Sequence, residues 1–328
     1  MYNNIIIVGT GKAGYLHYLK YKKMNMKNIV FLDNNNKSKY IDNSLICLSI
    51  EEIIKKYNFK TNETIIDICT PCSQFKHLID AFIEANFSAF IVEKPFVVEE
   101  DYFNDKKNIK CIMMENYKNS VITNKLINIL SKEKNKIKNI KIEFSKNRIK
   151  DSFSKRGMFD SEAPTNFEVE MPHEIYLADG LISSGEKVYK EIILRDMTFN
   201  DKSILNHGYG MIAYNQDETT VILESNLMAE YNKRTINIEL YNGTIINVAY
   251  LNYDNCFNLV SNGYIEIVKK DSNKKINFSY DDNMYESLKK YVYDLSNDRN
   301  IDKYKREIIN FSKIMKYCIE KGKVGNRE

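Results

Sequence analysis

The sequence predicts two domains: an α/β domain on a doubly wound parallel sheet, then an α+β domain on a large, mostly antiparallel open sheet. Three observations predict this arrangement. The chain has 328 residues, enough for two domains. Short apolar strands alternate with helical stretches in its first third, as in parallel βαβ units. After about Asn119, long strand-like runs are joined by turn signals, as in antiparallel sheets. We therefore divide the chain into residues 1–118 and 119–328.

The first domain begins with a short, fully apolar strand, Ile5 to Val8, and a helical stretch from about Lys12 to Lys23. Apolar runs and helical periods then alternate. The further elements that we expect are strands at Asn28 to Asp33, Leu45 to Leu48, Thr64 to Cys69, Ala89 to Val92 and Lys110 to Met114, and helices at Ile50 to Tyr57 and Phe75 to Asn86.

The second domain begins with a helix from Val121 to Ser131 and ends with two helices, Met284 to Leu295 and Tyr304 to Ile319. Between them the turn pairs Asn242-Gly243 and Asn262-Gly263 favour hairpins. The expected strands are Ile137 to Phe144, Tyr189 to Arg195, Thr219 to Leu227, Thr235 to Tyr241, Thr244 to Tyr250 and Gly263 to Val268.

The composition excludes several classes of protein. A net charge of +4, spread along the chain, is too small to suggest nucleic acid or an anionic membrane as partner. No run approaches the roughly 18 apolar residues that cross a bilayer, and the N-terminus lacks the features of an export signal. The six cysteines lie mostly in apolar segments, which suits reduced core thiols. We expect a soluble, cytoplasmic protein.

A glycine motif follows the first strand. The run Gly9-Thr10-Gly11-Lys12-Ala13-Gly14 matches G-x-G-x-x-G, and Asp33 ends the next strand 19 residues after Gly14. The first glycine permits a tight turn, the second lets the backbone approach a pyrophosphate, and the third allows close helix packing. The helix N-terminus favours the anion. This context predicts a Rossmann dinucleotide-binding domain.

Asp33 indicates which cofactor is preferred. Its carboxylate would accept hydrogen bonds from the adenosine ribose and repel a 2′-phosphate, which favours NAD over NADP. Lys37 and Lys39 follow closely and could soften this preference. A methyltransferase that uses S-adenosylmethionine also places an acid after a glycine turn, so this motif alone leaves that class open.

Two further motifs follow expected strands of the same sheet. Thr70-Pro71 comes after the strand Ile65 to Cys69, and Glu93-Lys94-Pro95 comes after Ala89 to Val92. Open α/β sheets bind ligands at these carboxyl ends. With the glycine run, these motifs make the sequence resemble the glucose-fructose oxidoreductase and inositol dehydrogenase family (Gfo/Idh/MocA). The resemblance spans nearly the whole chain and argues against a methyltransferase.

The resemblance implies roles for the second motif. Lys94 would point at the nicotinamide pocket and hydrogen-bond the reacting oxygen of the substrate, where a cation assists deprotonation of a hydroxyl. Glu93 and Lys94, with Thr70 and Pro71, would also contact the cofactor. In relatives the peptide before the proline is often cis, so we expect Pro95 to fix this turn. A solvated surface lysine is the alternative.

The resemblance also implies a histidine on a central helix. Relatives carry an acid four residues before this histidine, which accepts the proton. Here His173 follows Val169 at that spacing, so the pattern is broken. We expect Glu170 to take the place of the acid, and His173 to act as general acid and base. The alternatives are a structural histidine and, for Asp179, a second partner of His173 or a surface acid.

Substrate contacts are expected in two places. Tyr117 stands where relatives line the pocket. Arg148 belongs to a basic stretch that follows the first strand of the second domain. This stretch also contains Lys146, Lys150, Lys155 and Arg156. These cations could bind a carboxylate or phosphate, or could belong to a solvated loop. Cys69 and Cys72 have redox spacing, but no second pair completes a zinc site, so we expect no metal.

Together these features predict an NAD(P)-dependent oxidoreductase. It would transfer a hydride between nicotinamide and the carbinol or keto carbon of a sugar, a cyclitol or a sugar derivative. We expect NAD, with NADP possible, a small sugar-like substrate, and a homodimer or homotetramer paired through an apolar sheet face. The alternatives are a reductase of an imine or of a keto- or amino-sugar intermediate, and a non-catalytic cofactor or sugar sensor of the same fold.

Overall fold

The computed structural model describes residues 2–35, 37–133, 136–153, 164–182, 185–253 and 259–324. Contacts within the chain divide it into two compact units, each described by itself below. The first unit comprises Met1–Asn116 and Met284–Ser312, and the second comprises Tyr117–Asn283 and Lys313–Glu328. This division differs from our boundary after residue 118, because a C-terminal segment belongs with the first unit.

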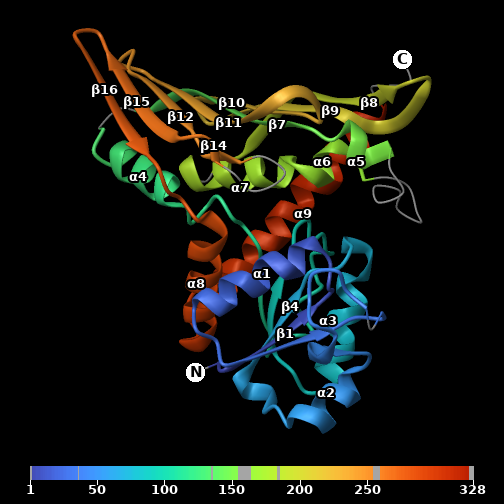
Figure 1. Ribbon diagram of the computed structural model, residues 1–328. Helices are drawn as coiled ribbons and strands as arrows, with labels where there is room; N and C mark the ends of the chain where they lie inside the picture. Colours follow the sequence, from blue (N-terminus) through green and yellow to red (C-terminus); the bar gives the residue numbers. More distant parts are fainter. Residues whose placement is uncertain are drawn as a thin grey trace. The chain divides into compact units, whose positions relative to one another are not determined.

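The first unit is built on a six-stranded sheet in the order β3-β2-β1-β4-β5-β6 (Figure 1). Every neighbouring pair is parallel, and the order reverses between β1 and β4. This is the doubly wound arrangement that the sequence predicts. Its strands are β1 (Asn4–Val8), β2 (Asn28–Leu32), β3 (Ile46–Cys47), β4 (Thr64–Ile68), β5 (Ala89–Val92) and β6 (Lys110–Met113), and its helices include α1 (Lys12–Lys23), α2 (Ile50–Tyr57) and α3 (Phe75–Glu84).

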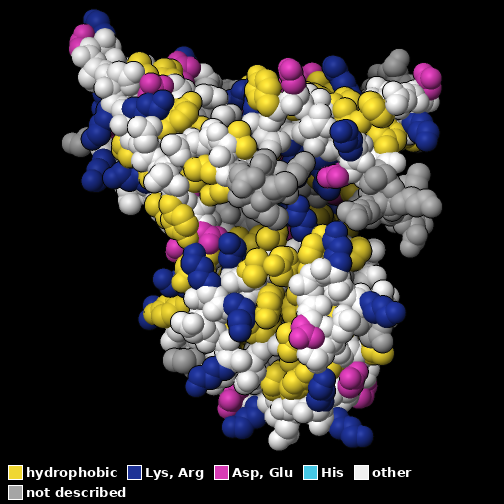
Figure 2. Space-filling model, in the orientation of Figure 1, with side chains coloured by type: hydrophobic (Ala, Val, Ile, Leu, Met, Phe, Trp, Pro, Cys, Tyr) yellow, Lys and Arg dark blue, Asp and Glu magenta, His cyan; other side chains and the backbone are white. Residues whose placement is uncertain are grey.

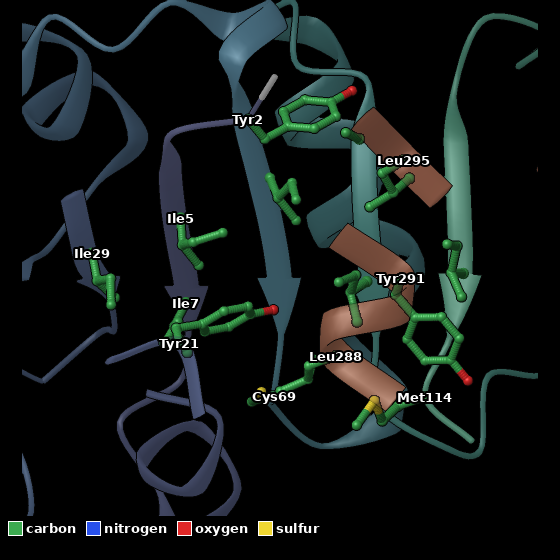
Figure 3. Close-up of a cluster of buried hydrophobic side chains, with 14 of the residues drawn as sticks. Tyr2, Ile5, Ile7, Tyr21, Ile29, Cys69, Met114, Leu288, Tyr291 and Leu295 are labelled. Atoms are coloured by element: carbon green, nitrogen blue, oxygen red, sulfur yellow. The ribbon is translucent and has the colours of Figure 1, made fainter. Parts of the chain in front are cut away.

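Helices α8 (Asn283–Ser296) and α9 (Ile301–Val324) follow the strands of the second unit in the sequence, yet α8 packs on the first sheet. Ile5 and Ile7 of β1 share one buried cluster with Leu288, Tyr291 and Leu295 (Figure 3). Alternate residues of a strand point to the same face, so α1 and α8 cover one face of this sheet. The apolar stripe of α8 predicts burial but not against which sheet, and our boundary therefore misplaced it.

The second unit is built on an eight-stranded sheet in the order β16-β15-β12-β11-β7-β10-β9-β8. Its neighbours are antiparallel except β7 and β10. The strands are β7 (Ile137–Asn147), β8 (Lys187–Phe199), β9 (Lys202–Gln216), β10 (Thr219–Asn226), β11 (Met228–Leu240), β12 (Ile245–Ala249), β15 (Gly263–Lys269) and β16 (Ser272–Phe278), with a small pair β13 (Asn252–Tyr253) and β14 (Leu259–Ser261).

Strand β9 was not expected, although it is the longest in the sheet. Its two glycines hid it, because glycine weakens a strand pattern. Both are explained by close approach: a Cβ on Gly208 would lie 2.3 Å from the Asp196 carbonyl oxygen, and one on Gly210 would lie 2.5 Å from Asn166 Oδ1. The β16 strand was missed because its residues are largely exposed and show no alternation.

The helices of the second unit pack on one face of its sheet (Figure 1). Helix α4 (Val121–Leu130) contacts β15, α6 (Asn166–Val169) contacts β9 and β10, and α7 (Met171–Leu181) contacts β7 and β10. A short helix, α5 (Ile149–Phe153), follows β7. The inward side chains of β7 are the buried Ile140, Ile142 and Phe144. The core of this unit therefore lies between the sheet and these helices.

The outward side chains of the same strands are more polar than we expected. Lys141 pairs with Glu224, Lys233 with Glu143 at 3.1 Å, and Lys138 with Glu239 at 2.8 Å, interspersed with half-buried apolar residues such as Ile222 and Ile245. The expectation of a large apolar face is wrong, since lysine and glutamate alternate with apolar residues along it. Figure 2 shows the same mixture of charges elsewhere on the surface. No helix within the described ranges is long and apolar enough to cross a membrane.

Candidate functional site

The glycine turn after β1 has the geometry that the motif predicts. Gly9 has a φ of 103°, which L side chains rarely adopt, and a Cβ there would lie 3.0 Å from the Cys69 carbonyl oxygen. A Cβ on Gly14 would lie 2.1 Å from the Gly9 carbonyl oxygen. The protein itself therefore requires these two glycines. At Gly11, by contrast, a Cβ would meet no atom of the described residues within 4 Å.

Helix α1 begins directly after this turn, with Lys12 and Ala13 as its first residues. Its N-cap is Gly11, which makes no side-chain capping bond, and the first turn contains no acid. The first amides of a helix lack intrahelical partners and carry partial positive charge. An anion placed beside Gly11 would therefore meet the positive end of α1, whose first turn contains no acid.

Asp33 follows β2 and holds the glycine turn. Its Oδ2 accepts hydrogen bonds from the backbone N of Thr10 at 2.7 Å and from Thr10 Oγ1 at 2.8 Å. Its Oδ1 accepts from the backbone N of Asn35 at 3.0 Å. The side chain stays half-buried. The carboxylate thus lies beside the turn, where an adenosine ribose binds in dinucleotide folds.

Thr70 and Pro71 follow β4 on the neighbouring strand. Thr70 Cγ2 lies 3.3 Å from the Cβ position of Gly9, which places this residue against the glycine turn. The Thr70 hydroxyl is buried and has no hydrogen-bond partner among the described residues, while Pro71 is exposed. A buried hydroxyl without a partner is costly unless a ligand satisfies it. With Gly11, this atom fits the binding of a dinucleotide along the turn.

Glu93 and Lys94 follow β5, the next strand. The backbone N of Glu93 donates to the Ile68 carbonyl at 2.9 Å and extends the sheet by one residue. The backbone N of Lys94 donates to Glu93 Oε2 at 3.1 Å. Both side chains are partly buried, and the Lys94–Pro95 peptide is cis. The carboxyl ends of four strands, β1, β2, β4 and β5, therefore carry the residues that the sequence predicts for the site in this unit.

A buried polar network under this edge was not expected. His17 of α1 lies between two acids: Nδ1 is 2.8 Å from Asp67 Oδ2, and Nε2 is 3.0 Å from Glu93 Oε1. His17 and Asp67 are fully buried. One signal could have revealed it, namely an aspartate inside the apolar strand β4, because a buried charge requires a partner. The partner lies 50 residues away and shows no local pattern.

Cys69 belongs to the same network. Its Sγ lies 3.4 Å from His17 Nδ1 and 3.6 Å from Asp67 Oδ1. Burial, with the charge of Asp67, raises the pKa of the Cys69 thiol to about 12. Such a thiol stays protonated and is a poor nucleophile, which argues against the redox alternative for Cys69 and the exposed Cys72.

The second unit gathers aromatic rings around His173 of α7. The Tyr117 ring lies 5.2 Å from the His173 ring, 4.8 Å from Phe144 and 4.9 Å from Tyr250, measured between centroids. His173 Nδ1 is hydrogen-bonded to the hydroxyl of Tyr176, one helical turn along α7. The structure thus brings together Tyr117 and His173, which the sequence analysis selected separately. Tyr176 was missed, although its i+3 position on the helix predicts contact with His173.

Glu170 lies at the junction of α6 and α7 and is buried. Its carboxylate pairs with Lys146 of β7 and, at 3.3 Å, with Arg234 of β11. The Arg234 guanidinium lies 5.4 Å from the Tyr117 ring centroid. Burial acts to lower the pKa of Arg234, but Tyr117 and Glu170 raise it above its ordinary value. Glu170 therefore holds two cations beside the aromatic cluster.

The remaining basic residues lie elsewhere in the second unit. The backbone N of Arg148 donates to the Leu227 carbonyl at 2.8 Å. The pKa of His207 is lowered by burial and, to a lesser extent, by the charge of Arg148. Within the basic stretch, Lys146 is the residue that pairs with Glu170 in the described contacts. Lys155 and Arg156 lie outside the described residues. Asp179 pairs with Lys187 at 2.8 Å, as a surface acid would.

Glu174 is a buried acid of α7 that the sequence analysis did not select. It is fully buried, and neither carboxyl oxygen has a hydrogen-bond partner of ordinary geometry among the described residues. Burial, together with the charge of Glu170, raises the pKa of Glu174 well above its ordinary value. The neutral form of Glu174 is therefore favoured over the carboxylate, because an isolated buried carboxylate is strongly disfavoured.

Comparison with known proteins gives a likeness of fold. No family model and no curated protein match the sequence. Among solved structures, UDP-N-acetylglucosamine 3-dehydrogenase GnnA from Acidithiobacillus ferrooxidans is 11% identical with a TM-score of 0.70, covering 98% of this chain and 99% of its own. KijD10, a 3-ketoreductase from Actinomadura kijaniata solved with TDP-benzene and NADP, is 9% identical with a TM-score of 0.72, covering 95% of both chains. The putative oxidoreductase yvaA from Bacillus subtilis is 13% identical with a TM-score of 0.72, covering 99% of this chain and 98% of its own.

Proposed function

We propose that this protein is an NAD(P)-dependent oxidoreductase of the Gfo/Idh/MocA type that acts on a sugar, a cyclitol or a sugar derivative. One observation carries the proposal. A glycine turn, an acid after β2, and a lysine after β5 occupy the carboxyl ends of a parallel sheet in the order β3-β2-β1-β4-β5-β6. This sheet order and these positions are typical of dinucleotide-dependent enzymes.

The turn between β1 and α1 is the proposed pyrophosphate site. Gly11 leaves room for a ligand, the N-terminus of α1 begins beside it, and the Thr70 hydroxyl is buried without a partner among the described residues. A bound nicotinamide dinucleotide would accept or supply the hydride of the reaction. Asp33 favours NAD over NADP, because its carboxylate would repel a 2′-phosphate. KijD10 binds NADP, so NADP remains a candidate cofactor.

Lys94 and His173 are the proposed catalytic residues. An ammonium at Lys94 would stabilise negative charge on the reacting oxygen of the substrate. His173 would exchange the hydroxyl proton, with its ring oriented by the hydrogen bond between Nδ1 and Tyr176. We assign the exchange to Nε2, the other ring nitrogen. Tyr117, together with Glu170 and the two cations that it holds, would help to bind the substrate.

The substrate class rests on the solved structures of similar fold. GnnA is a dehydrogenase of UDP-N-acetylglucosamine, and KijD10 is a 3-ketoreductase crystallised with a TDP compound. We therefore include nucleotide-linked sugars among the substrates to be tested.

We also propose a homodimer or homotetramer in the cytoplasm. Helices cover one face of the eight-stranded sheet. On its other face, apolar side chains such as Ile222 and Ile245 lie among ion pairs. Interfaces between subunits commonly mix such groups. Five described cysteines are free thiols, which suits a reducing compartment. Light scattering at micromolar concentration would test assembly, and a monomer of 38.5 kDa would refute it.

A cofactor titration followed by a substrate panel tests the proposed activity. We expect saturable binding of NADH, measured by fluorescence, and turnover with at least one UDP- or TDP-linked sugar, free sugar or cyclitol. Arg148→Ala and Tyr117→Phe should then change the KM of that substrate. Binding of NADH without turnover across the panel would favour a sensor, and turnover of imines alone would favour an imine reductase.

A further inference from the structure

His17 occupies an unusual place for a histidine. It lies on the buried face of α1, one turn before Tyr21, with no exposed surface. Each of its ring nitrogens lies within hydrogen-bond distance of a carboxylate oxygen, 2.8 Å to Asp67 and 3.0 Å to Glu93. A carboxylate can only accept a hydrogen bond, so both ring nitrogens must donate. With both acids ionised, the geometry therefore calls for a doubly protonated, positively charged ring.

The contacts continue from His17 to the proposed catalytic lysine. Glu93 uses Oε1 for His17 and Oε2 for the backbone N of Lys94, the latter at 3.1 Å. Asp67 stands in β4, His17 in α1, and Glu93 directly after β5. Asp67 thus holds the His17 ring, and the His17 ring holds the Glu93 carboxylate. The Glu93 carboxylate in turn holds the backbone of Lys94.

From this geometry we propose that His17 is a positioning residue: its imidazolium, anchored by Asp67, holds Glu93 so that Lys94 takes its working position. This proposal rests on the proposed role of Lys94. Charge balance supports it, since the cations His17 and Lys94 face the anions Asp67 and Glu93. A neutral His17 ring would donate to one acid and leave the other without its partner.

The surroundings of His17 favour its charged form. Burial acts to lower the pKa of His17, but the charge and hydrogen bond of Asp67 raise it well above its ordinary value. Burial acts to raise the pKa of Glu93, but His17 and Lys94 lower it. The other titratable groups facing His17 are the Cys69 thiol, which stays protonated, and the Tyr21 phenol, whose pKa is raised by burial and by Asp67.

A metal ion is the rival explanation for the cluster, because ligand atoms of His17, Asp67 and Cys69 lie within 4.8 Å of one another. The short distance argues against it. Two ligands about 2.0–2.2 Å from a tetrahedral zinc stand well over 3 Å apart. Nδ1 and Oδ2 are 2.8 Å apart, which is a direct hydrogen bond.

The first test observes the ring directly and needs no substrate. In ¹⁵N-labelled protein at pH 8, the His17 ring should give two slowly exchanging N–H signals. Both should vanish in His17→Asn and persist in His77→Asn, a matched change at an exposed histidine. A His17 ring with a single N–H would overturn the proposal. So would stoichiometric zinc retained against a chelator, lost in Cys69→Ser and kept in Cys72→Ser.

The second test separates positioning from stability. His17→Asn alone leaves Asp67 as an uncompensated buried charge and could unfold the protein. The double variant His17→Asn/Asp67→Asn removes cation and anion together, so its Tm should recover toward the wild-type value. Because Glu93 still lacks its partner, Lys94 Nζ should shift by ~1 Å in a crystal structure with NAD⁺. An unmoved Glu93 and Lys94 in that structure would overturn the proposal.

Turnover supplies the third test, on the best substrate of the wild-type panel. The double variant should lose about 10- to 100-fold in kcat while its Kd for NADH changes little. Asp67→Asn alone keeps an acceptor for Nδ1 but lets His17 lose its proton at lower pH. Its kcat should therefore match wild type near neutrality and fall at alkaline pH, where the wild-type value persists.

These outcomes distinguish the two proposals. If Lys94→Ala turns over like wild type, the proposed role of Lys94 fails, whatever the N–H signals of His17 show. If Lys94→Ala is inactive while the double variant keeps wild-type kcat, the positioning role of His17 fails and the proposed function stands.

Discussion

The carbonyl oxygen of Gly9 lies directly against Gly14, so that a Cβ on residue 14 would stand 2.1 Å from it. No side chain fits in that space, since real Cβ atoms essentially never come within 3.0 Å of another heavy atom. The strand β1 and the helix α1 can pack this closely because residue 14 is glycine. The motif is thus partly a packing device of the protein itself and, in our proposal, partly a ligand site.

The two roles predict different outcomes for two alanine substitutions. Gly14→Ala should destabilise the protein by about 1–3 kcal/mol, because it overpacks a tight contact. Gly11→Ala meets no described atom within 4 Å and should keep the wild-type Tm, while weakening NADH binding about tenfold or more. Calorimetry and a fluorescence titration would measure the two effects. Equal NADH affinity of Gly11→Ala and wild type would contradict the pyrophosphate site.

Asp33 should set the choice of cofactor. Wild type should bind NADH more tightly than NADPH, since the carboxylate beside Thr10 would repel a 2′-phosphate. Asp33→Ser should narrow the gap by about tenfold, because it removes the repelling charge and one acceptor of the ribose. Parallel titrations with both cofactors would check this. A wild-type protein that clearly prefers NADPH would refute the assignment.

A feature can be predicted from the sequence when the residues that produce it are close together in the chain. The glycine turn and its contact with Asp33 could be expected from the sequence, because the proposed binding of pyrophosphate and ribose demands fixed residues at fixed spacing. The pairing of His17 with Asp67 could not, since two residues 50 positions apart meet through the fold of β4 and α1. Asp67 alone, a charge within an apolar strand, signalled that some partner exists.

The same reasoning explains the elements that were missed or misplaced. Helix α8 has an apolar stripe that predicts burial, but Leu288 and Tyr291 bury it on the first sheet, which no local pattern shows. Strand β9 was hidden by Gly208 and Gly210, whose absent side chains make room for Asp196 and Asn166. In both cases a contact distant in sequence decides the structure.

Glu174 should make the stability depend on pH. Its pKa is raised in the folded protein by burial and by Glu170, so between its ordinary and its folded pKa the folded state binds one more proton than the unfolded state. Stability must then fall as the pH rises through this window. Glu174→Gln cannot titrate, and its Tm should exceed that of wild type increasingly from pH 5 to pH 8.

An exposed glutamate of the same unit supplies the control for this experiment. Glu186→Gln should show no such growing difference, because Glu186 is exposed to solvent. Thermal melts of the three proteins across the pH range would measure the effect. A Tm difference between Glu174→Gln and wild type that stays constant with pH would mean that Glu174 is not protonated in the folded state.

Lys94 should matter for the chemical step and little for cofactor binding. Lys94→Ala should lower kcat by roughly 100-fold or more at every pH, because it removes a charge that stabilises the transition state. The Kd for NADH should stay within a few-fold of wild type. Lys55→Ala, at an exposed position of α2, is the matched control and should leave both quantities unchanged. Steady-state kinetics with unchanged kcat for Lys94→Ala would place the chemistry elsewhere.

Replacing His173 should have a different effect from replacing Lys94, because His173 is proposed to exchange a proton. His173→Ala should lower kcat on the order of 100-fold near neutrality. Any limb of the wild-type pH profile that belongs to this ring should also disappear. Tyr176→Phe keeps the ring of His173 but removes its hydrogen-bond partner, so it should lower kcat less than His173→Ala does.

Because His173 packs among aromatic rings, the Tm of each variant must first be shown to stay near that of wild type. If His173→Ala is stable and its kcat and pH profile match wild type, then His173 is a structural residue of the aromatic cluster.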